Sequence, residues 1–265
     1  MRLANQRALV TGAGTGIGRG VALALAREGA SVALSYHSSQ AGALEAVAEI
    51  QALGCQAVAL QADLSDVAQC QRLVDDAIQA LGGLDILVNN SGRTLVQDFF
   101  QITPETFDQI YHTNIRSLYL TSQRAALHMR DHGGGVIINM SSVHGRLSAP
   151  GSSLYDGTKG AIDATTRSLG IELAPLGIRV VGVAPGIIEV PRYYDENPAY
   201  DRQRSARWVP LGRVGFPDDI GRLCAFLASD DAAFIVGDTI LCDGGMTGRL
   251  PIFRDEPQGA QRSET

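Results

Sequence analysis

The chain has 265 residues, a formal net charge of −6 and a hydrophobic fraction of 45%. This composition allows one large core, and the acidic balance argues against nucleic acid or an anionic membrane as a partner. The four cysteines stand far apart without CxxC spacing, which argues against a metal centre or a disulfide framework. Neither a leader sequence nor an apolar run of membrane-spanning length is recognisable, so we expect a cytoplasmic protein.

Short β-rich apolar segments alternate with longer stretches of helical periodicity. The expected strands are residues 7–11, 31–35, 57–61, 84–89, 136–140, 178–183 and 239–242. The expected helices are residues 17–28, 41–53, 67–81, about 104–130, 155–174 and 218–228. This alternation predicts an α/β fold, a doubly wound parallel sheet with helices on both faces. We expect a single domain over residues 1–247 and a polar tail over 248–265, in which Leu250–Phe253 is the apolar part.

The first expected strand runs into a glycine-rich turn, Thr11-Gly12-Ala13-Gly14-Thr15-Gly16-Ile17-Gly18, and a helix follows. Glycines permit a tight turn and let backbone N–H groups approach a pyrophosphate at the helix N-terminus. The spacing is TGxxxGxG, because Ile17 stands where the GxGxxG pattern requires its third glycine. Although glycine-rich turns are often simple connections, the position between the first strand and the first helix favours dinucleotide binding.

The segment Tyr36-His37-Ser38-Ser39 follows the second expected strand and bears on the choice of dinucleotide. Sites that prefer NAD usually place a carboxylate there for the ribose hydroxyls, and the next acidic residue here is Glu45. His37 and the serine hydroxyls are able to donate to a 2′-phosphate, but no arginine stands at this point. We therefore expect a moderate preference for NADP, with NAD as a usable alternative.

The chain has 22 basic residues of the lysine and arginine type, and only one of them, Lys159, is a lysine. Tyr155-Asp156-Gly157-Thr158-Lys159 places this ammonium and a phenol on one helix face. A phenol with a pKa of about 10 is a poor base near neutral pH, and a nearby positive charge stabilises its phenolate. The YxxxK spacing alone is common, but its coincidence with the single lysine favours acid/base chemistry.

Asn139-Met140-Ser141-Ser142 ends the fifth expected strand, at the sheet edge where parallel strands face a ligand crevice. A hydroxyl there is able to bond a carbonyl or alcohol oxygen, although serine pairs also commonly cap strand ends. The other strand ends favour the first interpretation. They carry Asp63-Leu64, Asn89-Asn90-Ser91-Gly92 and Pro185-Gly186.

With these motifs, the sequence resembles the short-chain dehydrogenase/reductase family over essentially its whole length. The segments that match are Thr11–Gly18, Asp63-Leu64, Asn89–Gly92, Asn114, Ser142, Tyr155, Lys159, Pro185-Gly186, 210–213 and 243–245. The resemblance implies a Rossmann fold and hydride transfer between a nicotinamide cofactor and a secondary alcohol or carbonyl. Two positions depart from the family pattern: Val190 stands in place of a threonine and Gly182 in place of an asparagine. We expect these changes to alter how the cofactor is held, without affecting the proton relay.

The resemblance also implies a role for each matched residue. Tyr155 would exchange a proton with the substrate oxygen, which Ser142 would orient. Lys159 would lower the pKa of Tyr155 and bind the nicotinamide ribose, and Asn114 would hold a water of the proton relay. The expected cofactor-binding residues are Gly12, Thr15, Gly16, Ile17, Gly18, Tyr36, His37, Ser38, Asp63, Leu64, Asn90, Ser91, Gly92, Tyr155, Lys159, Pro185, Gly186 and Ile188. No metal site is expected, because the histidines lack ligand spacing.

Among subfamilies, residues 138–144 and 243–247 resemble those of bacterial glucose 1-dehydrogenases, which implies a sugar or polyol substrate. The alternative is a 3-oxoacyl-carrier-protein reductase or another ketone reductase. Carrier-dependent enzymes usually present basic residues near the mouth of the site. We expect Gly133 and Leu176 to occupy these positions here, which argues against a carrier-linked substrate. A cofactor-sensing protein on the same fold is a remote alternative, against which the intact Asn-Ser-Tyr-Lys set argues. We expect substrate contacts from Arg93-Thr94, residues 144–154 and a substrate loop at 190–212.

The expected helices 104–130 and 155–174 carry more small and apolar side chains than one face of a sheet requires. Members of the family pair these two helices across a two-fold axis, and residues 241–246 offer a second contact. We therefore expect a homotetramer with a small-molecule substrate, and neither a nucleic-acid nor a membrane partner.

Overall fold

A seven-stranded sheet in the order β3-β2-β1-β4-β5-β6-β7 runs through the computed structural model, which describes residues 1–249. The strands are β1 (Arg7–Val10), β2 (Ser31–Tyr36), β3 (Ala57–Gln61), β4 (Ile86–Asn89), β5 (Gly135–Met140), β6 (Ile178–Pro185) and β7 (Thr239–Cys242). Every neighbouring pair is parallel. The chain moves outward from β1 to β3 and then returns to place β4 beside β1. This reversal opens a crevice at the carboxyl ends of β1 and β4, where such sheets bind their ligands.

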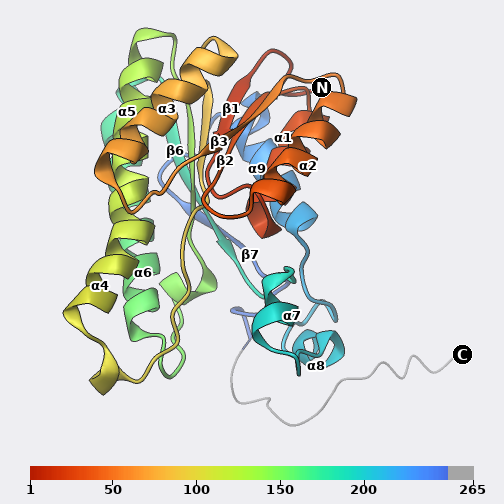
Figure 1. The fold of residues 1–265 in the computed structure, drawn as a ribbon, viewed down its shortest axis with the longest axis vertical. Helices are drawn as coiled ribbons and strands as arrows, with labels where there is room; N and C mark the ends of the chain where they lie inside the picture. The colour runs from red at the N-terminus through yellow and green to blue at the C-terminus, as the bar shows by residue number, and fades with distance from the viewer. Residues whose placement is uncertain (250–265) are drawn as a thin grey trace, which may run out of the picture.

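Helices cover both faces of the sheet (Figure 1). One face packs against α1 (Gly16–Arg27), α2 (Gln40–Ala52) and α9 (Pro217–Ala228). The other packs against α3 (Val67–Leu81), α5 (Ser117–Asp131) and α6 (Ser153–Leu173). Because both faces are covered, the strands are mostly apolar, and Leu9 and Val10 face opposite cores with no exposed surface. The predicted doubly wound α/β fold is confirmed.

Capping residues explain why several helices begin where they do. The Asp66 side chain accepts hydrogen bonds from Ala68 N and Gln69 N at the start of α3, which ends at Gly82 with a φ of 74°. Thr103 caps α4 (Pro104–Tyr111) in the same way, and proline occupies its first position. These side chains satisfy backbone N–H groups that have no partner within the helix.

Most predicted elements end within two residues of the observed ones, but the predicted helix at 104–130 differs. It is divided into α4 and α5 by a π-helical segment, His112–Arg116. The hydroxyls of Thr113 and Ser117 donate to the carbonyls of Gln109 and Thr113, which offers these carbonyls partners inside the wider turn. Such π-helical turns occur frequently at functional sites.

The loop at 190–212 contains two short helices that the sequence did not predict, α7 (Arg192–Glu196) and α8 (Arg202–Ala206). Both lie below the carboxyl edge of the sheet in Figure 1. Of the predicted tail, only Gly248 and Arg249 belong to the described residues, so Leu250–Phe253 lies outside them. Within residues 1–249, none of the helices is both long and apolar enough to cross a membrane.

Candidate active site

The glycine turn after β1 is held by residues that follow β4. Thr11 Oγ1 accepts hydrogen bonds from Asn90 N and Ser91 N, both at 3.0 Å. Asn90 Nδ2 donates to the carbonyls of Thr11 and Gly12, at 2.9 and 3.1 Å. The structure therefore brings together two of the predicted cofactor segments, and it places them at the crevice between β1 and β4.

Backbone geometry explains the TGxxxGxG spacing of this turn. Gly12 and Gly16 have φ values of 64° and 57°, a region that L side chains rarely adopt. A Cβ atom at Gly18 would lie 2.4 Å from the carbonyl oxygen of Gly12. The Thr15 side chain makes no capping bond to α1, so it does not occupy the N–H groups of the first turn of this helix. This arrangement fits a dinucleotide pyrophosphate.

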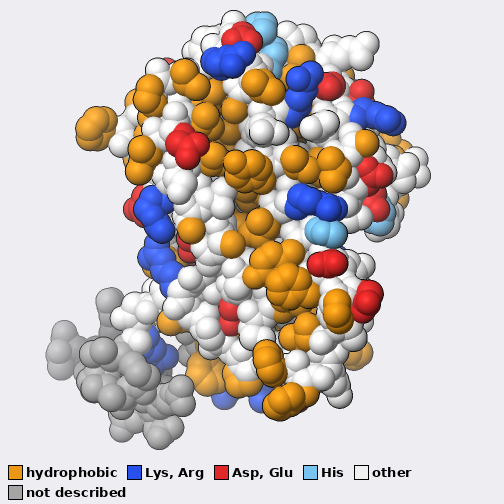
Figure 2. Space-filling model, turned by 90° about the vertical axis from the view of Figure 1, so that its left-hand side faces the viewer, with side chains coloured by type: hydrophobic (Ala, Val, Ile, Leu, Met, Phe, Trp, Pro, Cys, Tyr) orange, Lys and Arg blue, Asp and Glu red, His pale blue; other side chains and the backbone are white. Residues whose placement is uncertain are grey.

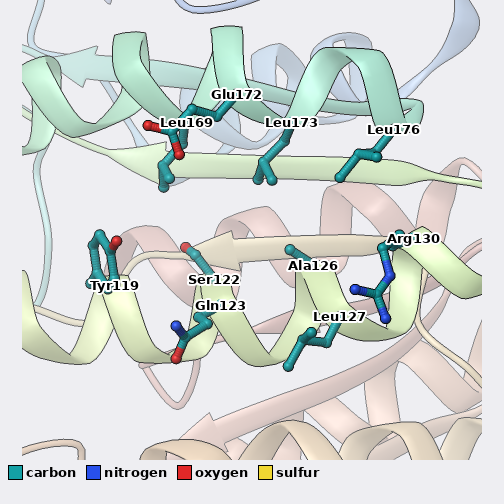
Figure 3. A pocket seen from close by; sticks show the side chains of 10 residues that line it. All are labelled: Tyr119, Ser122, Gln123, Ala126, Leu127, Arg130, Leu169, Glu172, Leu173 and Leu176. Atoms are coloured by element: carbon teal, nitrogen blue, oxygen red, sulfur yellow. The ribbon is translucent and has the colours of Figure 1, made fainter.

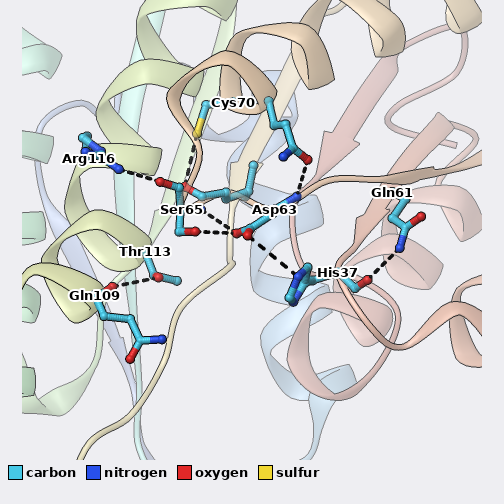
Figure 4. Close-up of polar contacts among 10 residues, drawn as sticks. His37, Gln61, Asp63, Ser65, Cys70, Gln109, Thr113 and Arg116 are labelled. Carbon is cyan, nitrogen blue, oxygen red and sulfur yellow. Dashed lines mark hydrogen bonds and ion pairs between the residues drawn. The ribbon is translucent and has the colours of Figure 1, made fainter. Parts of the chain in front are cut away.

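His37 and Ser38, at the end of β2, are exposed, and Figure 4 shows the ring of His37 directed toward Asp63. His37 Nε2 lies 3.9 Å from Asp63 Oδ2, which comes from the segment after β3. Hydrogen bonds from the Ser65 hydroxyl and backbone N–H lower the pKa of Asp63, so this group is a carboxylate. A carboxylate therefore lies beside His37, although the sequence places no acidic residue between Tyr36 and Glu45.

Three residues predicted to bind the cofactor have side chains that are largely buried in the protein. Tyr36, Leu64 and Ile188 are 8%, 7% and 4% exposed, and each belongs to a hydrophobic core cluster. These three residues therefore belong to the packing of the protein, and little of their surface is open to a ligand.

β6 ends at Pro185, and Gly186 begins the segment that returns to the glycine turn. Gly186 N donates to Cys242 O at 3.1 Å, and a Cβ at Gly186 would lie 2.8 Å from Asp243 Cα. A Cβ at Gly16 would lie 3.3 Å from Val190 Cγ1. Val190, the residue that departs from the family pattern, therefore packs against the glycine turn.

The three predicted catalytic side chains Ser142, Tyr155 and Lys159 converge where β5 meets the first turns of α6. The hydroxyl groups of Ser142 and Thr94 lie next to the Tyr155 hydroxyl and act to lower its pKa. Lys159 Nζ lies 5.5 Å from the centre of the Tyr155 ring and donates to Met140 O at 2.9 Å. Only 5% of Lys159 is exposed. A phenol, a serine hydroxyl and an ammonium are thus held in one buried group.

Burial dominates the electrostatics of this group. It lowers the pKa of Lys159 to about 8, and the nearby carboxylate of Asp163 acts weakly in the opposite direction. Burial also raises the pKa of Tyr155. Hydrogen bonds with Ser142 and Thr94, and then the positive charge of Arg192, oppose that increase. The balance differs from the expectation that Lys159 lowers the pKa of Tyr155, because desolvation of the phenolate outweighs the stabilising contacts.

Asn114 lies in the π-helical segment and is 1% exposed. Its Oδ1 accepts from Arg93 N at 2.8 Å, and its Nδ2 donates to Arg93 O and to Thr158 Oγ1. A Cβ at Gly92 would lie 3.3 Å from Asn114 Oδ1 and 3.9 Å from Lys159 Nζ. Gly92 therefore leaves room for Asn114 beside Lys159, and the amide joins the segment after β4 to α6.

Several side chains at the site have contacts that the motifs did not reveal. Thr94 reaches the Tyr155 hydroxyl, and Arg192 Nη2 donates to Thr94 Oγ1 at 3.3 Å. His144 Nδ1 lies 2.6 Å from Asp156 Oδ1, and its ring meets that of Tyr155 edge to face, 5.4 Å between centres. The sequence named Thr94, His144 and Arg192 only as members of substrate-contacting segments. Asp156, inside the YxxxK motif, carried no distinguishing signal.

Known proteins match this chain over most of its length. A family model described as enoyl-(acyl carrier protein) reductase, of the short-chain dehydrogenase type, matches residues 12–247. An uncharacterized oxidoreductase of Methylorubrum extorquens is 42% identical over 247 residues, covering 92% of this chain and 99% of the relative. The chain belongs to the short-chain dehydrogenase/reductase family. It is an NAD(P)-dependent oxidoreductase that acts on CH–OH groups, as its sequence predicted.

Other relatives differ in the molecules that they bind. A hydroxynaphthalene reductase-like protein of Metarhizium brunneum is 40% identical and covers 92% of this chain and 95% of its own. A Burkholderia cenocepacia short-chain dehydrogenase in complex with NADP has a TM-score of 0.85 and 36% identity, with coverage of 93% and 100%. A 7α-hydroxysteroid dehydrogenase with NADH and 7-oxoglycochenodeoxycholic acid has a TM-score of 0.87 and 33% identity, with coverage of 92% and 95%.

Proposed function

We propose that the chain transfers a hydride between NADP or NAD and a secondary alcohol or its ketone, with Tyr155 as acid and base. The observation that carries this proposal is the convergence of Ser142, Tyr155 and Lys159 beside Gly92, in the segment that holds the glycine turn. A nicotinamide cofactor, when bound, supplies or accepts the hydride at its C4 carbon. In the oxidation direction, the Tyr155 phenolate takes the hydroxyl proton of the substrate as the carbon loses its hydride.

The remaining residues act on this proton and on the substrate oxygen. Ser142 and Thr94 lie next to the Tyr155 hydroxyl, so a substrate oxygen at this position would be oriented by the same hydroxyls. Lys159, with its pKa near 8, provides positive charge next to the phenol and is close to Asn114. We assign Asn114 to a water-mediated relay toward Lys159, and the cofactor to the glycine turn, Asp63, Asn90–Gly92 and Pro185-Gly186.

For the substrate, we propose a sugar or polyol. Polar side chains lie around Tyr155: Thr94 and Ser142 beside its hydroxyl, His144 against its ring, and Arg192 on Thr94. Such a set offers several hydrogen bonds to neighbouring hydroxyl groups. We expect NADPH or NADH to form when hexoses or polyols are added to enzyme and oxidised cofactor. The absorbance of the reduced nicotinamide measures this reaction. Absence of turnover with every alcohol and ketone tested would refute the hydride-transfer function.

A less polar ketone is a second candidate, which the surface around the entrance favours. Val96, Phe99, Phe100 and Leu147 are 71%, 69%, 92% and 48% exposed, and a Cβ at Gly151 would touch Val96. The sequence-based argument from Gly133 and Leu176 against carrier-linked substrates does not hold. These residues precede β5 and β6, so in this chain they lie at the opposite edge of the sheet from Tyr155.

The preference for NADP can be tested at position 37, which is exposed, whereas Tyr36 is buried. We expect the parent protein to use NADP at least as well as NAD, because His37 and Ser38 offer donors to a 2′-phosphate. His37→Asp should shift the ratio of kcat/KM values toward NAD, since a carboxylate repels that phosphate and accepts ribose hydroxyl bonds. The matched control is Gln56→Asp, on the surface before β3. A parent with a strong preference for NAD would contradict the proposal.

We propose a homotetramer, built first around α5 and α6. Figure 3 shows the groove between these helices, about 220 Å³ in volume, with Leu127, Leu169, Leu173 and Leu176 along it. Apolar side chains gather on this face of the molecule (Figure 2). Ile171, also on α6, is 72% exposed. A second copy related by a two-fold axis would cover this surface, and the edge strand β7 with the residues after it offers the second interface.

Light scattering tests the assembly at micromolar concentration. We expect a mass about four times the 28.1 kDa of one chain. Leu127→Asp should reduce it, because a carboxylate would be buried without a partner in the α5–α6 interface. Leu44→Asp is the control, since Leu44 is 54% exposed on α2, on the opposite side of the sheet. A parent mass of one chain would refute both interfaces, and a dimer would leave only the first.

A further inference from the structure

We propose that Arg192 determines substrate specificity by binding a carboxylate group of the substrate next to the reacting alcohol or ketone carbon. This inference rests on the proposed hydride transfer and narrows the proposed polyhydroxylated substrate to one that also carries a carboxylate, such as a sugar acid. It is based on the position of Arg192 relative to Tyr155, on the way its helix is held, and on the chemistry of guanidinium groups.

Arg192 is the first residue of α7 and comes from the segment that passes the glycine turn at Val190. Its Nη2 atom donates to Thr94 Oγ1 at 3.3 Å, a contact between residues 98 positions apart. The same Thr94 side chain lies next to the Tyr155 hydroxyl and acts to lower its pKa. One hydroxyl group therefore separates the guanidinium from the residue that exchanges a proton with the substrate.

The segment that carries Arg192 is tied to the end of β6. Glu189, 9% exposed, accepts hydrogen bonds from Arg202 Nε and Nη2 at 2.7 and 2.5 Å. The Tyr200 hydroxyl donates to Glu189 Oε2 at 3.2 Å. Two groups near α8 thus hold the residue three positions before Arg192. The guanidinium is presented to the site by an anchored loop, as recognition of one substrate group requires.

The neighbouring cation Lys159 is not available for a substrate carboxylate, since it is buried and its Nζ donates to Met140 O. Arg192 remains exposed enough to meet a ligand, and its positive charge acts on Tyr155. A planar guanidinium binds a carboxylate through two parallel hydrogen bonds. A substrate oxygen at Tyr155 and Ser142 would leave a carboxylate on the adjoining carbons within reach of Arg192.

The experiment compares pairs of substrates that differ in charge but not in carbon skeleton. The probes are 2-hydroxybutanoate and 3-hydroxybutanoate, each against its methyl ester, with oxidised cofactor and the full-length chain. The measured quantity is the ratio of kcat/KM for the acid to kcat/KM for the ester. The variants are Arg192→Gln and Arg192→Lys. The control is Arg204→Gln, which removes a guanidinium from α8, on the same loop.

We expect the parent to prefer at least one acid over its ester, and Arg192→Gln to reduce that ratio about 10- to 100-fold, as for a lost charge-assisted pair. Arg192→Lys should restore part of the ratio, because the charge remains while the fork is lost. Arg204→Gln should leave it unchanged. If Arg192 only fastens the loop to Thr94, acid and ester will lose activity equally, and the proposal is overturned.

Two further outcomes separate this proposal from the proposed function. Oxidation of neutral alcohols or sugars, with neither acid accepted better than its ester, overturns the carboxylate at Arg192 and leaves the hydride-transfer function intact. Failure to oxidise or reduce any alcohol or ketone in the wider screen refutes the proposed function itself, and the inference with it.

Discussion

Replacing Tyr155 with phenylalanine is expected to reduce kcat by about 10²- to 10⁴-fold, the usual contribution of a general acid or base. The ring would still fill its place beside His144, where the two rings meet at 5.4 Å, so the fold should be preserved. Only the hydroxyl next to Ser142 and Thr94 is removed. Cofactor binding should therefore survive, because the glycine turn is held by Asn90 and not by Tyr155.

Fluorescence titration with reduced cofactor measures binding in this variant, and initial rates measure turnover. Tyr119→Phe is the matched control, since Tyr119 is 49% exposed on α5, away from Ser142. Loss of cofactor binding together with turnover would mean that Tyr155 has a structural role. Turnover close to that of the parent would show that another group exchanges the proton.

The same residue sets the direction of the pH dependence. Burial raises the pKa of Tyr155, so the phenolate that oxidation requires becomes populated only at higher pH. The rate of alcohol oxidation should therefore increase with pH across the alkaline range, while ketone reduction, which requires the protonated phenol, should decline there. Thr94→Val should move the oxidation profile further toward high pH, because the Thr94 hydroxyl opposes the effect of burial.

The fold was predictable because each strand is apolar along its length and each helix has periodic apolar positions. The interruption between α4 and α5 was not predictable. Asn114, which lies inside it, contacts Arg93 and Thr158, and the sequence pattern does not show such distant contacts. The short helices α7 and α8 were not predictable from the sequence pattern either. Five-residue helices have too few turns to produce a periodic signal. In addition, α7 follows Glu189, which is held by a contact with Arg202 in α8.

The site divides in the same way between local and distant relationships. Tyr155 and Lys159 are four positions apart on one helix, so their proximity follows from helical geometry. By contrast, Thr94 and Arg192 meet across 98 positions, and His37 approaches Asp63 from a different strand. Such contacts depend on how loops pack. The sequence could name these residues as members of segments but could not assign their partners.

Lys159→Arg is expected to reduce kcat about 100-fold or more while most of the fold is retained, at the low end of the effect of losing a proton-transfer group. Lys159 is 5% exposed, and its ammonium fits a space bounded by Met140 O and the Tyr155 ring. Arginine brings a larger planar group into this space. Burial lowers the pKa of Lys159 to about 8, so the lysine is able to release and regain a proton near neutral pH. A guanidinium remains charged throughout that range and cannot take part in a relay.

The substitution should also destabilise the protein, by about 1–3 kcal/mol, because a permanent charge and additional volume are placed in a packed site. Thermal unfolding measures this effect, and steady-state rates at several pH values measure the catalytic one. Arg167→Lys on the exposed surface of α6 is the control for exchange of the two cations on the same helix.

Below pH 8, where Lys159 is mostly protonated, the parent and the Lys159→Arg variant carry the same charge at position 159, so a rate difference there reports geometry. Above pH 8, the parent ammonium loses its proton and the arginine does not, so the profiles should diverge further. Near-normal turnover of Lys159→Arg across this range would show that only a positive charge is needed, and would remove the proton relay from the mechanism.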